Sequence, residues 1–324
     1  MPAASVPAGN SLPYRERYRV PQPIVVIGSI NMDLVCRTPH MPVGGETILG
    51  SDFVTVPGGK GANQAVAAAR LGGDVHMIGR VGDDDFGKRL LAGLGSSGVN
   101  IDRVPITKGI ASGVAMILVD AKGQNSITVA PGANFKVSTK DIDAAKDLIA
   151  SAAAVVLQLE IPLPVVRHAM ALCRKLGVVV VLDPAPAPAK LPKELFAADV
   201  FTPNESEAAI LLGLKSSDGE PQEIAAALMK RGARSVVLKR GKHGASWFDR
   251  TGQVATAKAF KVKVVDTTAA GDSFTAGLAV ARAEGMEPEE ALRFACAAGA
   301  ICCTGFGAQP SLPTRKQVNQ LINM

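Results

Sequence analysis

The sequence predicts an α/β protein, a three-layer sandwich in which helices cover both faces of a mainly parallel central sheet, with a small β-sheet lid. Three observations support this prediction. Short Val/Ile/Leu runs alternate with amphipathic segments from Ile24 onward. These runs are continuously apolar, as in parallel strands buried on both faces. Two long segments have β-type patterns and no helix.

Each element follows from its local pattern. Buried strands are expected at Ile24–Ile27, Val75–Ile78, Ala154–Leu159, Val178–Leu182, Val200–Thr202 and Ser235–Leu238. Helical spacing of apolar residues occurs between them, for example at Ala62–Leu71, Phe86–Gly95, Val165–Leu176 and Ile224–Arg231. The β-branched residues Val262, Val264 and Val265 predict one more strand, ahead of a helix that begins near Gly271.

The two segments without a helix are residues 34–56 and 112–130. The second has the pattern of a hairpin, Val114–Val119 and Ser126–Val129, around a polar turn. We expect both to form the lid over one end of the sheet, where it would exclude water from a reaction.

Length and composition predict one large domain. The chain has 324 residues, of which 47% are hydrophobic and 20% charged, so it can bury a large core. Residues 1–23 contain five prolines and no apolar run, which predicts a disordered extension rather than a signal peptide. The domain is therefore expected to span residues 24–324, with the lid inside it.

Composition also argues against several classes of protein. The five cysteines form no CxxC pair and leave an odd one over, which favours a reducing compartment, the cytoplasm, over a disulfide framework or zinc site. The four histidines have no metal-site spacing, which argues against a histidine-based metal site. The net charge of +6 is spread along the chain and aromatic residues make up only 4%, so no nucleic-acid platform is predicted. No apolar run approaches the length of a membrane span.

The most informative stretch is Asp266–Phe274, where small residues join the last predicted strand to a helix. Small residues leave N–H groups exposed at the helix start, and the helix dipole favours an anion there. One carboxylate, Asp272, lies within this array of donors. An ordinary helix cap would explain the Asp alone but not the run of small residues around it.

Polar residues follow five of the predicted strands, at the edge where an open α/β sheet binds ligands. Any one of them alone could be a turn or cap residue, but their convergence predicts a site. They are Asn31 and Asp33, Glu160, Asp183, the segment Asn204–Glu207, and the segment Lys239–Gly244.

A second glycine-rich element spans Pro57–Ala65. Gln64 stands where a dinucleotide fingerprint needs glycine, and no Ser or Thr follows the Gly-Lys pair as a Walker A motif requires. The element offers backbone N–H groups, Lys60 and Asn63, which together with the acceptor Asp33 suit a polyhydroxyl ligand.

These motifs strongly resemble the ribokinase family of carbohydrate kinases, from about Ile24 to the end of the chain. The resemblance rests on Gly58–Ala65 and Asp266–Phe274 as the two signatures, with Gly28–Asp33, Thr202–Glu205 and Gly307–Ser311. It implies an ATP-dependent transfer of phosphate to the 5-hydroxyl of D-ribose, with Mg²⁺, a monovalent K⁺ activator and a homodimer that pairs through the lid.

The resemblance also implies residue roles. Sugar contacts fall on Asn31, Asp33, Gly59, Lys60, Asn63 and Glu160. Nucleotide contacts fall on Asn204, Lys239, Gly241, Lys242, His243, Gly244, Gly271 and Cys296, with Glu207 organising Mg²⁺ and phosphate. Ala269, Ala270 and Gly271 form the anion hole, and Asp272 is the general base. The K⁺ loop comprises Asp266, Thr268, Cys302, Gly305, Gly307 and Ser311.

Two departures from the family pattern bear on nucleotide preference. Cys296 replaces a His or Asn that is frequent near the adenine, and Lys239-Arg240 replaces a pair that is more often neutral. Alternatives within the class are a kinase for deoxyribose or another small sugar, and, with less support, an adenosine kinase. A nicotinamide dehydrogenase and a non-catalytic sugar-binding relative represent other classes.

Overall fold

The computed structural model describes residues 22–216 and 219–324. The predicted N-terminal extension lies almost entirely outside the described residues.

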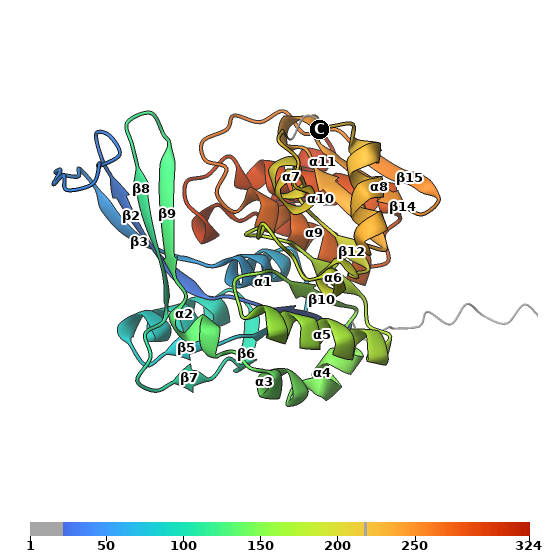
Figure 1. The fold of residues 1–324 in the computed structure, drawn as a ribbon, viewed down its shortest axis with the longest axis horizontal. Coiled ribbons are helices and arrows are strands. Elements are labelled where there is room, and N and C mark those ends of the chain that lie inside the picture. The colour runs from blue at the N-terminus through green and yellow to red at the C-terminus, as the bar shows by residue number, and fades with distance from the viewer. Residues whose placement is uncertain (1–21, 217–218) are drawn as a thin grey trace, which may run out of the picture.

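The centre of the molecule is a nine-stranded sheet (Figure 1). Seven strands are parallel neighbours, in the order β13-β12-β11-β10-β1-β4-β6. Their bounds are β1 Ile24–Ile27, β4 Val75–Ile78, β6 Val99–Arg103, β10 Ala154–Leu157, β11 Val180–Leu182, β12 Val200–Phe201 and β13 Ser235–Lys239. Two antiparallel strands, β14 (Ala245–Asp249) and β15 (Gly252–Ala257), extend the sheet beyond β13.

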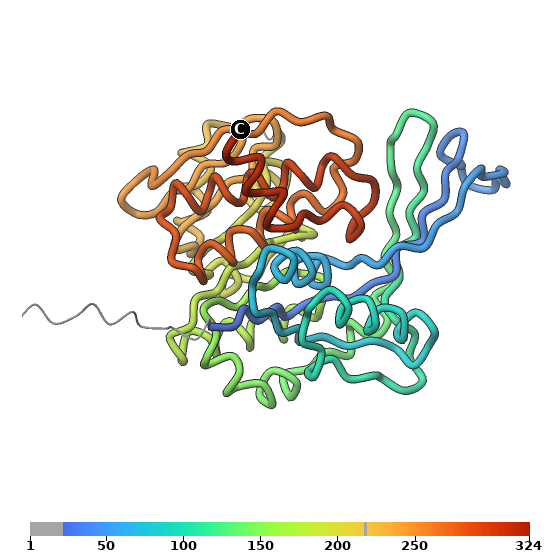
Figure 2. Tube along the Cα trace, turned by 180° about the vertical axis from the view of Figure 1, so that it is seen from behind, coloured from blue at the N-terminus to red at the C-terminus, as the bar shows by residue number. Residues whose placement is uncertain are grey.

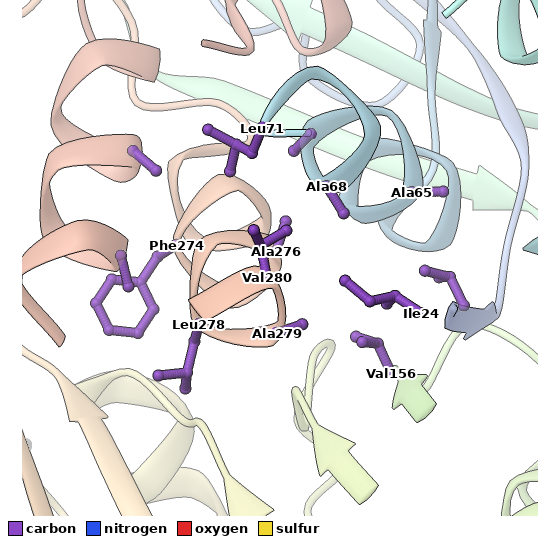
Figure 3. Close-up of a cluster of buried hydrophobic side chains, with 14 of the residues drawn as sticks. Ile24, Ala65, Ala68, Leu71, Val156, Phe274, Ala276, Leu278, Ala279 and Val280 are labelled. Carbon is purple, nitrogen blue, oxygen red and sulfur yellow. The ribbon is translucent and has the colours of Figure 1, made fainter. Parts of the chain in front are cut away.

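Helices cover both faces of this sheet. Successive residues of a strand point to opposite sides, so each central strand contributes side chains to both cores. In β1, Ile24 and Val26 belong to one hydrophobic core and Val25 and Ile27 to the other. The first core, part of which is shown in Figure 3, includes α1 Lys60–Arg70, α2 Asp85–Ser96, α9 Ala270–Ala283, α10 Pro288–Cys302 and α11 Arg315–Ile322. The second includes α3 Thr139–Asp143, α4 Lys146–Ser151, α5 Leu163–Leu176, α6 Lys193–Phe196, α7 Glu205–Leu212 and α8 Pro221–Arg231.

A separate four-stranded sheet, here called the small sheet, projects from this body (Figures 1 and 2). Its order is β3-β2-β8-β9, with bounds β2 Asn31–Arg37, β3 Phe53–Gly58, β8 Gly113–Val119 and β9 Asn125–Ala130. The predicted hairpin is the antiparallel pair β8–β9. Strands β5 (Val81–Gly82) and β7 (Ile106–Thr107) pair separately. Three 3₁₀ turns complete the elements, η1 Gly132–Lys136, η2 Gly241–His243 and η3 Gln309–Ser311.

The fold class predicted from sequence is correct, but one predicted strand is wrong. Residues 262–265 form no strand, and Val264 and Val265 are exposed. The N–H groups of Val265 and Asp266 donate to the carbonyl of Cys303, just past α10, rather than to a neighbouring strand. A smaller error is that β10 ends at Leu157, two residues before the predicted end.

Within the described ranges 22–216 and 219–324, no helix is both long and apolar enough to cross a membrane.

Candidate active site

The start of α9 has the features of an anion-binding site. Ala269 precedes the helix with φ 60°, a left-handed conformation that is uncommon for a residue with a Cβ. This turn directs the chain into α9, whose first N–H groups lack acceptors within the helix. Asp272 lies in this first turn and is only 5% exposed. The carboxylate and the helix donors therefore occupy the same site.

Asp272 is held by two amides from the other glycine-rich element. Asn63 Nδ2 donates to its Oδ2 at 3.0 Å, and Gln64 Nε2 donates to its Oδ1 at 3.0 Å. Burial raises the pKa of Asp272, Lys60 and the two amides oppose that shift, and Asp183 adds to it. A carboxyl group with a raised pKa accepts a proton more readily than an ordinary one.

The loop before α1 is shaped by close backbone packing. A Cβ on Gly61 would lie 2.6 Å from the backbone nitrogen of Ser29, so only glycine allows this approach. The N–H of Lys60 donates to Glu160 Oε2 at 3.1 Å, and the N–H of Gly61 donates to Ser29 Oγ at 3.3 Å. The sequence predicted that N–H groups of this loop contact a ligand. Two of them instead bond within the protein.

The residues predicted to contact a sugar converge beside this loop. Asp33 lies on β2, and its pKa is raised to about 7 by burial and by the carboxylates of Glu160 and Asp272, while Lys60 lowers it. Burial disfavours the charged form of Lys60, but the surrounding carboxylates outweigh it and raise the pKa of its ammonium group. Asn31 Oδ1 accepts from Asn134 Nδ2 at 2.7 Å, which fixes the start of β2.

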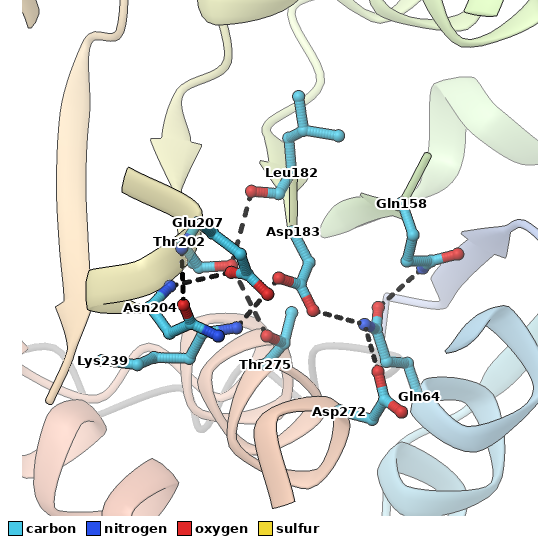
Figure 4. A network of polar contacts seen from close by, with 10 residues as sticks. All are labelled: Gln64, Gln158, Leu182, Asp183, Thr202, Asn204, Glu207, Lys239, Asp272 and Thr275. Carbon is cyan, nitrogen blue, oxygen red and sulfur yellow. Dashed lines mark hydrogen bonds and ion pairs between the residues drawn. The ribbon is translucent and has the colours of Figure 1, made fainter. Parts of the chain in front are cut away.

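The residues predicted to contact a nucleotide lie on the other side of Asp272. Asn204 and Glu207 cap α7 reciprocally, each side chain accepting from the other's backbone N–H at 2.8 Å. Lys239 Nζ lies 2.9 Å from Asp183 Oδ1, and a Cβ on Gly271 would lie 3.5 Å from that Nζ. The ammonium group therefore lies close to the start of α9. Figure 4 shows its contact with Asp183.

The remaining nucleotide candidates flank this region. The turn after β13 forms η2, in which Gly241, Lys242 and His243 are exposed, and Gly244 follows with φ 85°. Cys296 is buried in α10.

The six residues predicted for a monovalent cation form one cluster, here called the Asp266 cluster. Asp266 Oδ1 accepts from Thr268 N at 2.9 Å, and Oδ2 accepts from Gly307 N at 2.9 Å. Cys302 Sγ lies 3.4 Å from the carbonyl of Thr268 and 3.2 Å from Ser311 Oγ. Gly305 packs against Ser311 at a distance that leaves no room for a Cβ.

The structure also reveals buried polar residues that were not predicted as site residues. Gln64 and Gln158 are fully buried, and Asn134 bonds to the backbone of Ile30. Asp183, which the sequence did predict as a strand-end residue of the site, is 1% exposed. A sequence signal existed for Gln64, because a long amide within an alanine-rich helical face is unusual for a core position. Gln158 was hidden because the strand was predicted to continue through it.

Comparison with known proteins identifies relatives along nearly the whole chain. The model of the pfkB family of carbohydrate kinases matches residues 22–315. A ribokinase of Schizosaccharomyces pombe is 41% identical over 311 residues, covering 93% of this chain and 98% of the relative. A deoxyribokinase of Salmonella typhi is 39% identical over 306 residues, covering 93% and 99%. The structure of Arabidopsis thaliana ribokinase with ribose and ATP superposes with a TM-score of 0.86 at 36% identity, covering 94% and 99%.

Proposed function

Because this chain belongs to the pfkB family of carbohydrate kinases, we propose that it transfers the γ-phosphoryl group of ATP to the 5-hydroxyl of D-ribose, giving D-ribose 5-phosphate and ADP. The observation that carries this proposal is the location of the buried Asp272 carboxylate inside the N-terminal turn of α9, with Lys239 above it. A base, an anion site and a cation are the parts that phosphoryl transfer to an alcohol requires.

In this mechanism Asp272 accepts the proton of the 5-hydroxyl as that oxygen attacks the γ-phosphorus. The bond between the γ-phosphorus and the β,γ-bridging oxygen breaks, and ADP leaves with that oxygen. The N–H groups of Ala269, Ala270 and Gly271 stabilise the negative charge on the transferring oxygens. Lys239 lies where its ammonium group adds to that stabilisation.

The sugar end of the site supplies recognition. Asp33 accepts from ring hydroxyls, and Asn31, Lys60, Asn63 and Glu160 complete the set together with the backbone of Gly59. Support comes from Asn63 Oδ1, a buried acceptor without a hydrogen-bond partner among the described residues. A sugar hydroxyl is a donor that suits this oxygen.

Two metal ions complete the proposal. Glu207 would hold Mg²⁺, because hard cations prefer carboxylate and phosphate oxygens, and this carboxylate lies close enough to Lys60 and Lys239 to raise the pKa of both. Mg²⁺ supplies neutralisation of phosphate charge when bound. The Asp266 cluster combines one carboxylate with neutral oxygens, the Thr268 carbonyl and the Ser311 hydroxyl, which suits K⁺ better than a divalent ion.

We also propose a homodimer and a cytoplasmic location. The small sheet exposes apolar side chains on its two edge strands, including Val54 of β3 and Ile127 and Val129 of β9, which are 42%, 53% and 43% exposed. Pairing with a second copy would cover them. All five cysteines are free thiols, which suits a reducing compartment.

The direct test is ADP release with Mg²⁺, ATP and one candidate acceptor at a time. D-Ribose should support turnover, and mass spectrometry should show the phosphate on carbon 5. A reaction without sugar controls for ATP hydrolysis. The relative named deoxyribokinase makes 2-deoxyribose the second candidate, and equal or greater kcat/KM for that sugar would replace ribose as the assigned substrate. Turnover with adenosine alone would overturn the proposal.

A further inference from the structure

One buried amide links the two acidic groups at the centre of the site. Gln64 Nε2 donates to Asp272 Oδ1 at 3.0 Å and to Asp183 Oδ2 at 2.9 Å (Figure 4). Both partners are carboxylate oxygens, which only accept, so the NH₂ group of Gln64 must face them. Its Oε1 accepts from Gln158 Nε2 at 2.6 Å, which fixes the same orientation from the other side.

Burying the carboxylates of Asp183 and Asp272 next to one amide costs free energy, which points to a catalytic role for the arrangement. Gln64, Asp183 and Asp272 are each at most 5% exposed, and two carboxylates that share one amide repel each other. Lys239 offsets the charge of Asp183 through its 2.9 Å ion pair, while Asp272 has no ion pair within 4 Å among the described residues. Asp183 is therefore paired with the Lys239 ammonium group, and Asp272 remains available as the proton acceptor.

We propose that Gln64 is a positioning residue for the phosphoryl transfer: its amide aims the Asp272 carboxylate at the sugar hydroxyl and keeps it apart from the Asp183–Lys239 pair. This inference rests on the proposed function, since it assigns Gln64 a role through the base. Asp183 is its counterpart, because it orients Gln64 from one oxygen and holds Lys239 over Gly271 from the other.

Other charged groups also face Asp272. Lys60 on α1 lowers its pKa and Asp183 raises it, while Asp33 on β2 and Cys302 on α10 each interact with its charge. A variant at Gln64 leaves all of these charged groups in the chain. Its shift therefore reports the loss of the amide, including any approach of Asp272 to Asp183 that follows.

The test is the pH dependence of kcat at saturating ribose and MgATP, which reports groups in the complex with substrates. Gln64→Met keeps the length but removes the donor, and it should move the acidic limb of the profile upward by about one pH unit. Asp183→Asn removes the like charge and should move the same limb downward. The double variant should lie between the two, because the charge that Gln64 separates is then absent.

Gln158→Met is the matched control, since it removes the bond to Gln64 Oε1 and leaves both carboxylate contacts. The acidic limb of the Gln158→Met profile should shift by clearly less than that of the Gln64→Met profile. Circular dichroism and thermal unfolding check that each variant folds. If Gln64→Met does not fold, Gln64→Asn, whose shorter side chain withdraws the amide from both carboxylates, takes its place in the same measurement.

Superimposable profiles for Gln64→Met and wild type, or for Asp183→Asn and wild type, would overturn the inference. So would equal shifts in Gln64→Met and Gln158→Met, which would indicate general loss of packing. A failure of the proposed function looks different, because the wild-type protein itself would then show no ribose-dependent ADP release.

Discussion

Asn63 Nδ2 donates a 3.0 Å hydrogen bond to Asp272 Oδ2, and the two residues are 209 positions apart in the chain. The bond joins the first glycine-rich element to the second. Asn63 Oδ1 is buried and has no hydrogen-bond partner among the residues that the structure describes. In the proposed mechanism, one amide side chain would therefore bind the sugar and orient the base.

Replacing the base should stop the chemistry. Asp272→Asn keeps the shape but cannot accept the proton, so kcat should fall by roughly 10²–10⁴-fold, with much less effect on the dissociation constant of ribose. Steady-state kinetics and calorimetry measure the two quantities. The thermal midpoint at neutral pH should not drop, because burial already disfavours the charged carboxylate. Substantial remaining turnover would leave Asp272 as a helix cap only.

Ribose binding should depend on the ionisation of Asp33. Its pKa of about 7 means that the carboxyl group loses its charge, and one acceptor, as the pH falls below neutrality. The dissociation constant should therefore rise below about pH 7, and Asp33→Asn should bind weakly without this dependence. Calorimetry between pH 5.5 and pH 8.5 measures the dissociation constant of ribose for the wild-type protein and for Asp33→Asn. The same pH dependence in both proteins would contradict the assignment.

The same shift predicts how stability changes with pH. The folded-state pKa lies above the ordinary value, so the folded protein binds more protons than the unfolded chain between about 4 and 7. Stability from this group is then lost as the pH rises through 7. Asp33→Asn should consequently raise the thermal midpoint more at pH 8 than at pH 5.

Ribose should be preferred over 2-deoxyribose. Without the 2-hydroxyl, the buried Asp33 is left without a donor at a cost of about 1–3 kcal/mol, roughly a five- to 150-fold loss in kcat/KM. The ratio of kcat/KM for ribose to kcat/KM for 2-deoxyribose measures this loss. Asp33→Asn should bring that ratio closer to one. Equal efficiency on both sugars would favour the deoxyribose alternative.

Monovalent cations should affect turnover. The Asp266 cluster touches the loop that leads into α9, so an ion bound there would order the anion site without touching substrate. Rates in K⁺ should exceed those in Na⁺ or a bulky organic cation at matched ionic strength, and Asp266→Asn should abolish the difference. Indistinguishable rates in the wild-type protein would leave Asp266 as a turn-capping residue.

The small sheet should pair with its copy in solution. Sedimentation at micromolar concentration should show a dimer, and Ile127→Lys should shift it towards monomer because it places a charge on the exposed apolar face. Thr128→Lys, on the opposite face of the same strand, is the matched control. A wild-type protein that sediments only as monomer would exclude lid pairing.

The sequence predicts the sheet and the convergence of its strand ends because both depend on local patterns. Apolar runs such as Ile24–Ile27 and Val75–Ile78 match β1 and β4 residue for residue. Polar residues beyond parallel strands must share one edge, which is how Asp33, Glu160 and Lys239 were placed in one site.

What the sequence misses depends on distant partners. A strand at 262–265 fails because β-branched residues form a strand only beside another strand, and here Cys303 supplies the acceptor. The hydrogen bonds of Gln64 were also not predicted. Gln64 lies on α1, and its partners Gln158 and Asp183 come directly after the ends of β10 and β11. No pattern within one element indicates that three such side chains meet.

The location of Asp33 on β2 has a mechanical consequence. β2 continues from the main body into the small sheet, whereas Asp272 is carried by α9 in the body (Figure 1). If the small sheet swings, Asp33 moves relative to Asp272. In the proposed mechanism, the carboxylate that would contact the sugar would then separate from the carboxylate that would accept its proton. Recognition and proton removal would be possible together only while the small sheet is in place.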